Sequence, residues 1–138
     1  MPSIVVDTGP LYAMADRDDD WHHRTVRFLE TNRDDLVVPA SVLPEAAYLL
    51  LTHLGTAAEQ QLVQSVVKGE FAVEGLTHAD YRRALDLLRR YESARLGFVD
   101  ATVMAIAERL NVQRILTTDR RDFSIVRPRH CKQFALLP

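Results

Sequence analysis

Short runs of β-branched and other apolar residues alternate along this chain with longer segments of helical periodicity. The strand-like runs cover residues 4–6, 36–39, 71–73, 114–117 and 134–137. Alternation of this kind is typical of α/β proteins, because a helix must cross the face of a sheet before the next strand can lie parallel to the last one. The pattern predicts a layered α/β fold: a mainly parallel sheet of four to five strands with helices on both faces.

Helix boundaries follow from capping residues and from breakers. Helices are predicted from residue 8 onward and over residues 21–31, 41–54, 56–68, 77–91 and 99–110. Thr8 and Thr77 are interpreted as N-caps, and Thr56–Glu59 as a capping box. Gly55 ends the helix before it. Phe123–Val126 is predicted to be an irregular extension, and the run at 134–137 an edge strand.

The size and composition of the chain favour one ordinary domain. With 138 residues, 47% of them hydrophobic and 26% charged, residues 1–138 are predicted to form a single domain with its own core. The longest apolar run covers only Ala46–Leu51, so no membrane span is expected. No basic stretch followed by a long apolar region opens the chain, and Cys131 is the only cysteine. We therefore expect a cytoplasmic protein without an internal disulfide.

Four acidic residues lie next to apolar segments far apart in the sequence. Asp7 follows the first strand, and Asp119 comes after the fourth. Glu45 and Asp100 lie near the starts of two helices, which in a right-handed β-α unit is also the carboxyl end of a strand. Because ligands of open α/β sheets bind at that edge, we expect the four carboxylates to converge there.

Converging carboxylates indicate a divalent cation. Two unit charges about 4 Å apart repel each other by about 4 kcal/mol at an effective dielectric near 20, and a cation removes this cost. Magnesium and manganese prefer oxygen ligands of this kind. Such a site can activate a water molecule and neutralise charge that builds on a phosphodiester in the transition state.

Each acid also has a purely structural interpretation. Asp7 could cap the helix that follows it, Glu45 could pair with an arginine, and Asp119 could be a turn residue. Asp122 is interpreted as a turn residue first. An unpaired aspartate among apolar neighbours is rare, which makes Asp100 the hardest to explain without a function.

Two threonines and two arginines are the remaining candidates for the site. Thr8 and Thr117 are interpreted first as a cap and a strand-end hydroxyl, and either could orient a carboxylate or hold a water molecule. Fifteen arginines stand against two lysines, and most are consistent with solvated helix faces. Arg120 and Arg121 adjoin a candidate acid, and the planar guanidinium group suits phosphate recognition.

Four segments together resemble a known family. They are IVVDTGPLYA, SVLPEAAYLL, LGFVDATVMAIAERL and ILTTDRRDF, around Asp7, Glu45, Asp100 and Asp119 respectively. In this order and at this length, they resemble a PIN domain and, more narrowly, the VapC-type toxins of bacterial toxin–antitoxin pairs. No single segment is specific, but the four in order are.

The resemblance implies a three-layer α/β/α, PIN-like sandwich and Mg²⁺-dependent cleavage of RNA, with Mn²⁺ as a substitute metal. It places the metal-binding acids at Asp7, Glu45, Asp100 and Asp119, with support from Thr117. It also implies a homodimer and inhibition by a cognate VapB-type antitoxin. Gly9 departs from the pattern, since many relatives carry a small polar residue there.

Two other readings compete with a ribonuclease. A non-catalytic PIN-like module would bind RNA or a protein through the same groove, but uncompensated carboxylates do not favour a polyanion. The absence of heat or of a thermal shift on addition of Mg²⁺ or Mn²⁺ would favour that module. A phosphatase with an aspartate nucleophile after its first strand would fit Asp7. That chemistry usually needs a second aspartate at the position of Gly9.

Overall fold

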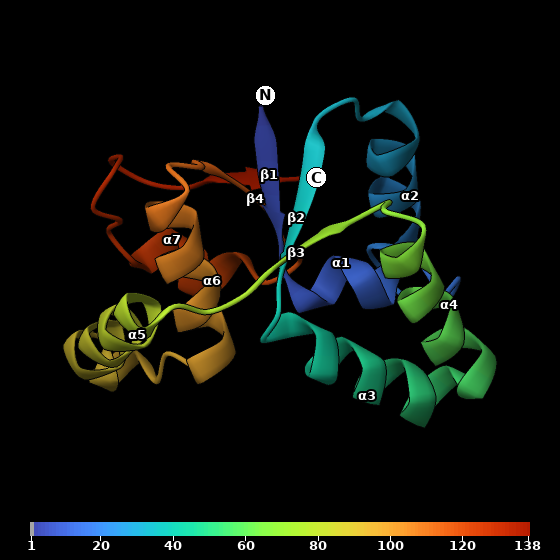
Figure 1. Cartoon of the computed structure of the whole chain (residues 1–138), viewed down its shortest axis with the longest axis horizontal. Coiled ribbons are helices and arrows are strands. Elements are labelled where there is room, and N and C mark those ends of the chain that lie inside the picture. The colour runs from blue at the N-terminus through green and yellow to red at the C-terminus, as the bar shows by residue number, and fades with distance from the viewer. Residues whose placement is uncertain (1) are drawn as a thin grey trace.

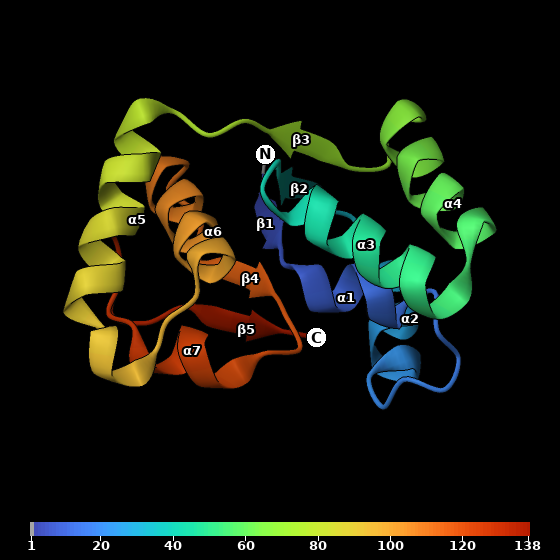
Figure 2. The same cartoon turned by 90° about the horizontal axis from the view of Figure 1, so that it is seen from below.

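A five-stranded parallel sheet separates two groups of helices in the computed structural model, which describes residues 2–138 (Figure 1). The strands are β1 (Ser3–Val6), β2 (Asp35–Pro39), β3 (Ala72–Glu74), β4 (Arg114–Leu116) and β5 (Ala135–Leu137). The helices are α1 (Thr8–Ala13), α2 (His22–Thr31), α3 (Val42–Leu54), α4 (Thr56–Val67), α5 (His78–Arg90), α6 (Phe98–Arg109) and α7 (Arg120–Ile125), with a 3₁₀ turn at Glu92–Ala94. Helices α1–α4 lie on one side and α5–α7 on the other (Figures 1 and 2). The predicted three-layer α/β/α fold is confirmed.

The strand order, β3-β2-β1-β4-β5, reverses direction between β1 and β4. From β1 the chain moves outward through β2 to β3, and then returns to the other side of β1 for β4 and β5. Val6 pairs with Leu116 at the carboxyl ends of these two central strands. A reversal of strand order opens a crevice there, because the connections leave the sheet in opposite directions. The residues that follow β1 and β4 therefore border the crevice.

The core explains why the first strand reads as a continuous apolar run. Ile4, Val5 and Val6 are all fully buried, since helices cover both faces of a parallel sheet. Across the sheet, every residue of Ala101–Ala107 in α6 is buried as well. A helix apolar around its whole circumference is expected where it packs against the sheet on one side and other helices on the other. Asp100 comes immediately before this buried segment and is thereby held at the rim of the core.

Two of the predicted helix ends are confirmed in detail. Gly55 ends α3 with φ 97°, a left-handed conformation that glycine adopts without steric cost. Thr77 caps α5: its Oγ accepts a hydrogen bond from the Asp80 amide at 3.2 Å, and the Asp80 carboxylate accepts one from the Thr77 amide at 2.9 Å. This reciprocal pair is a complete capping box.

Three local predictions are wrong. Thr8 is the first helical residue of α1, and Asp7 stands at the N-cap instead. Thr56 likewise lies inside α4, whose N-cap, Gly55, has no side chain to form the predicted box. The segment after Asp119 is the helix α7, not an irregular extension. Its residue Phe123 is fully buried in the core, and this packing stabilises a helix too short to persist alone.

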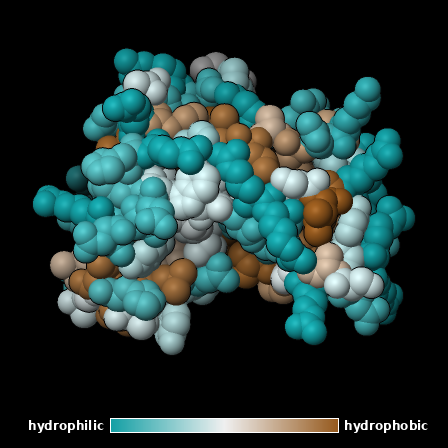
Figure 3. Space-filling view, turned by 180° about the vertical axis from the view of Figure 1, so that it is seen from behind, coloured by the Kyte–Doolittle hydropathy of each residue, from teal (hydrophilic) through white to brown (hydrophobic). Residues whose placement is uncertain are grey.

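The surface carries polar and apolar side chains in a mixed pattern. The face shown in Figure 3 is mostly hydrophilic, with apolar areas separated by polar side chains. Among the helices of residues 2–138, none is both long enough and apolar enough to cross a bilayer.

Candidate metal centre

An acidic pocket of about 430 Å³ lies at the carboxyl ends of β1, β2 and β4. Its wall contains all four acids singled out from the sequence, Asp7, Glu45, Asp100 and Asp119. The neutral part of the wall is formed by Thr8, Gly9, Leu49, Gly97, Phe98, Val99 and Thr118. The expected convergence of distant carboxylates is therefore what the fold produces. We refer to this hollow as the acid pocket.

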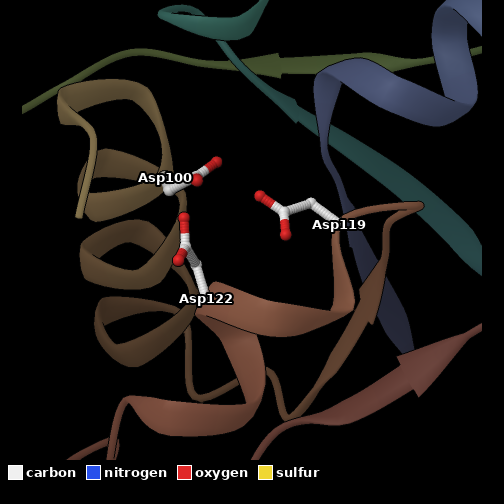
Figure 4. A group of neighbouring side chains, drawn as sticks. All are labelled: Asp100, Asp119 and Asp122. Atoms are coloured by element: carbon white, nitrogen blue, oxygen red, sulfur yellow. The ribbon is translucent and has the colours of Figure 1, made fainter. Parts of the chain in front are cut away.

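Three aspartates form the tightest group beside the acid pocket. One carboxylate oxygen from each of Asp100, Asp119 and Asp122 lies within 4.8 Å of the other two. Asp100 comes from the first turn of α6, whereas Asp119 and Asp122 come from the start of α7, and their carboxylates point toward one another (Figure 4). Three oxygens at this spacing can share one cation.

Asp7 is the most deeply buried of the four acids that line the acid pocket, with 4% of its surface exposed. Its Oδ2 accepts a hydrogen bond from the Thr117 hydroxyl at 2.9 Å, and the same hydroxyl oxygen accepts the Asp119 amide at 3.0 Å. Its Oδ1 is buried and has no hydrogen-bond partner among the residues that the structure describes. Thr117 is therefore hydrogen-bonded to both Asp7 and Asp119, and its supporting role in the site stays a prediction.

The environment of Asp7 disfavours its ionised form. Burial raises the pKa of this carboxyl from 3.8 to about 6. The amide of Thr8 and the hydroxyl of Thr117 oppose the shift, while the negative charges of Glu45 and Asp119 add to it. Without a cation, the pocket thus holds a carboxylate at a substantial electrostatic cost.

Asp100 shows the same behaviour. Its pKa is also raised, first by burial, then by the charge of Asp7 and by interaction with the carboxyls of Asp122 and Asp119. Both causes reflect the fold: the position at the rim of the core removes water, and the sheet reversal gathers the other acids. The start of a helix offsets part of the cost, because the helix dipole favours negative charge there.

Glu45 and Thr8 occupy different depths of the same wall. Glu45 lies exposed in the first turn of α3, which follows β2, and belongs to the rim of the acid pocket. Thr8 is buried, and its hydroxyl has no hydrogen-bond partner within residues 2–138. The structure therefore brings both into the pocket, with Glu45 outside the tight aspartate group.

Asp122 joins the aspartate group, although the sequence favours a turn residue at this position. The helix α7 places Asp122 one turn beyond Asp119 on the same side of the helix. It is buried, and the exposed Arg121 binds its Oδ1 at 2.8 Å. The three-residue spacing of Asp119 and Asp122 places both on one side of a helix, but this can be inferred only if the segment is known to be helical.

The two candidate arginines differ in what already holds them. Arg120 donates to the Pro138 carbonyl oxygen at 2.8 Å, and its guanidinium lies 5.2 Å from the centre of the Trp21 ring. Arg121 is 66% exposed and also donates to the Ala94 carbonyl oxygen at 3.1 Å. Arg121 is therefore the more accessible of the two to a ligand that enters the acid pocket.

The residues present fit a hard divalent cation. Every charged donor in the acid pocket is a carboxylate oxygen, the ligand type that Mg²⁺ and Mn²⁺ prefer. The buried and unpartnered Oδ1 of Asp7 is an acceptor that such an ion would satisfy. Neither Asp7 nor Asp100 has an ion pair with any arginine, lysine or histidine of residues 2–138.

Comparisons with known proteins agree with this arrangement. The family model described as "PIN domain" matches residues 4–127. Ribonuclease VapC26 of Mycobacterium tuberculosis is 30% identical over 135 residues, which are 98% of this chain and 100% of that protein. The crystal structure of VapC20 of the same organism, described as a sarcin-ricin loop cleaving toxin, superposes with a TM-score of 0.80 at 23% identity, over 94% of this chain and 98% of that one. A toxin–antitoxin complex from Klebsiella pneumoniae matches with a TM-score of 0.69 at 17% identity, over 89% of this chain and 92% of the other. The chain therefore belongs to the PIN-domain family and, within it, to the VapC-type ribonucleases.

Proposed function

We propose that this protein is a metal-dependent endoribonuclease that acts as the toxin of a toxin–antitoxin pair. The observation that carries the proposal is the acid pocket itself, which gathers carboxylates from four segments of the chain, none of them in an ion pair within the described part of the chain. Family membership supplies the reaction class, and we infer that residues 1–138 act as one PIN domain.

In this proposal Asp100, Asp119 and Asp122 hold Mg²⁺, with Asp7 and Glu45 completing the acidic wall. Mn²⁺ is expected to substitute, because it prefers the same ligands. When bound, the cation would neutralise charge that develops on the phosphodiester and favour the ionised form of an attacking water. Asp122 thereby joins the four acids predicted from the sequence.

The protein groups have separate tasks. Thr117 keeps the Asp7 carboxylate in one orientation through the 2.9 Å hydrogen bond. A carboxylate of the acid pocket would accept the proton of the attacking water, and Phe98 and Val99 belong to the wall beside it. Arg121, and less directly Arg120, would contact phosphates of the RNA. Such contacts add affinity and salt dependence without reading the sequence.

Partners follow from the same family membership. We infer that a VapB-type antitoxin inhibits this protein, supported by the likeness to a chain of a toxin–antitoxin complex. We also expect a homodimer, and action on cytoplasmic RNA. Co-expression with any short reading frame next to the gene, followed by size-exclusion chromatography with light scattering, tests both assemblies.

Cleavage of RNA by the purified protein is the direct test. Total RNA is incubated with the protein in Mg²⁺, in Mn²⁺ and in excess EDTA, and the ends of the products are mapped. We expect cleavage with either metal, none in EDTA, and restoration when Mg²⁺ is added back. Metal-independent cleavage, or no heat of Mg²⁺ binding in calorimetry, would contradict the proposal and favour a non-catalytic binding module.

A further inference from the structure

The acid pocket is rich in acceptors and poor in donors. Its carboxylates can only accept hydrogen bonds when ionised, and so can the non-bridging oxygens of a phosphodiester. Two side-chain hydroxyls belong to the wall, those of Thr8 and Thr118. The Thr8 hydroxyl is buried, whereas Thr118 is partly exposed. Thr118 therefore offers a hydroxyl proton where a phosphate could reach it.

The Thr118 hydroxyl is not used inside the protein. It forms no hydrogen bond with any of residues 2–138, in contrast to Thr117, whose hydroxyl bonds both Asp7 and Asp119. The two adjacent threonines thus divide their roles. Thr117 holds the site together, and Thr118 is left available beside it.

Gly9 explains how Thr118 comes to occupy this place. A Cβ added at Gly9 would lie 2.0 Å from the Thr118 Oγ1 and 3.1 Å from its Cβ. Gly9 lies within α1 and not among the glycines with positive φ, so no unusual backbone conformation requires a glycine here. What the fold uses is the missing side chain. The Thr118 hydroxyl fills the space that a side chain at position 9 would take.

We propose that Thr118 is a substrate-binding residue whose hydroxyl donates a hydrogen bond to an oxygen of the scissile phosphate, and that Gly9 provides the room for it. The inference rests on the proposed ribonuclease function and deepens it. Thr118 follows β4, and its hydroxyl lies beside Gly9, in the helix that follows β1.

The first experiment compares Thr118→Val with Thr118→Ser in cleavage of one RNA substrate at saturating Mg²⁺. Valine keeps the shape and removes the donor, and serine keeps the donor. A lost hydrogen bond to a charged group corresponds to a decrease in kcat/KM of roughly ten- to hundredfold, which we expect for valine alone. The Mn²⁺ affinity and the melting temperature of the valine variant should stay as in the wild type. If Thr118 had only a structural role, the loss of activity would come with a loss of affinity or stability.

The second experiment moves the hydroxyl to the other side of the pair. Gly9→Ser/Thr118→Ala and Gly9→Ala/Thr118→Ala share the same steric frame and differ by one oxygen atom. Because the new Cβ lies so close to the former Oγ1 position, a serine hydroxyl can reach the same space. We expect the serine variant to cleave roughly tenfold faster than its alanine counterpart.

The outcomes separate this inference from the proposal on which it rests. Wild-type protein that fails to cleave RNA would overturn the ribonuclease function. Active wild-type protein with equal rates for Thr118→Val and Thr118→Ser, or for the two double variants, would overturn only the role of Thr118. A loss of Mn²⁺ affinity in Thr118→Val equal to its loss of activity would also overturn it, because the hydroxyl would then serve the metal site.

Discussion

Carboxylates gather both in the acid pocket and between α5 and α6. Those between α5 and α6 are paired with arginines, whereas those that line the acid pocket have no ion pair with any of residues 2–138. Between α5 and α6, Arg83 donates from Nε and Nη2 to the two oxygens of Glu108, at 2.7 and 2.9 Å. Beside it, Arg109 donates to both oxygens of Asp80 at 3.1 Å. In the acid pocket, the buried Asp7 and the half-buried Asp100 have no arginine, lysine or histidine partner among residues 2–138. The carboxylates between α5 and α6 thus have their cationic partners inside the protein. Those of the acid pocket do not have such partners among residues 2–138.

The pKa values move in opposite directions in the two regions. Burial alone would raise the pKa of Asp80, but hydrogen bonds from Arg109 and from the Thr77 amide outweigh it and lower the pKa. Burial raises the pKa of Asp7 to about 6, and no ion pair with another of the described residues compensates. A buried acid with its arginine is therefore accounted for within the fold. A buried acid without one indicates a ligand from outside.

The largest effect that we expect is a loss of RNA cleavage on substitution in the acid pocket but not between α5 and α6. Asp100→Asn should reduce RNA cleavage on the order of 10²–10³-fold, because it removes one of the carboxylates that would hold the cation. Asp86→Asn is the matched control, since Asp86 belongs to the paired network through Arg83 at 2.6 Å. Gel assays of both variants at equal Mg²⁺ measure the difference. Comparable cleavage by both would break the distinction.

Stability should respond in the reverse way. Arg83→Met leaves Glu108, whose side chain is 8% exposed, buried without its cation. We expect a loss of roughly 3 kcal/mol in the free energy of unfolding, measured by urea denaturation in Mg²⁺. The protein that remains folded should cleave RNA at the wild-type rate. A large loss of activity without loss of stability would show that the α5–α6 network belongs to the site.

The pH dependence of stability sharpens the contrast in metal-free protein. In EDTA, the folded state keeps the proton of Asp7 up to about pH 6, while the unfolded state releases it near 3.8. The folded state therefore binds more protons between these values, and the free energy of unfolding decreases as the pH rises through this window. Above about pH 6, the raised pKa of Asp7 lowers the free energy of unfolding of the metal-free protein by about 3 kcal/mol.

Asp7→Asn removes this titration and should make metal-free protein more stable than the wild type at pH 7.5, with little difference near pH 4. Its hydrogen bond from Thr117 can persist, because the asparagine carbonyl is also an acceptor. Asp86→Asn should keep the wild-type slope. Denaturation series from pH 4 to pH 8 measure all three proteins, and a wild type that gains stability across this range would contradict the raised pKa.

The fold and most of the pocket could be predicted because their signals are local and repeated. A β-branched run ending at Asp7 and another ending before Asp119 define neighbouring strands, and the rule for parallel sheets then brings the acids together. The place of Asp122 beside Asp100 and Asp119 could not be predicted, for a physical reason. The short helix α7 depends on burial of Phe123, a tertiary contact that a local pattern does not reveal. The space at Gly9 depends on Thr118, 109 positions away in the chain, and was likewise invisible to local patterns.

Asp122→Asn tests whether Asp122 contributes to metal binding together with Asp100 and Asp119. Its oxygen lies within 4.8 Å of those of Asp100 and Asp119, so its loss should weaken Mn²⁺ binding roughly tenfold. Titration calorimetry measures the affinity, and Asp86→Asn again serves as the control. An unchanged affinity would assign Asp122 to Arg121 alone, as an ion pair of the kind found between α5 and α6.

Thr117→Val should have the smallest effect and is the finest test of the comparison. The Thr117 hydroxyl is a hydrogen-bond donor to Asp7, and it lowers the pKa of that carboxyl against the effect of burial. Its removal should cost about 1 kcal/mol of stability in saturating Mg²⁺. It should also raise the pKa of Asp7 further, so that the acidic limb of Mn²⁺ binding moves to higher pH. Calorimetric titrations at a series of pH values measure this limb, and Thr102→Val, whose hydroxyl bonds Ser41 and Val99 away from Asp7, controls for the loss of a buried hydroxyl. An equal movement in both variants would mean that Thr117 only packs, and that the ionisation of Asp7 is set by burial and the neighbouring acids.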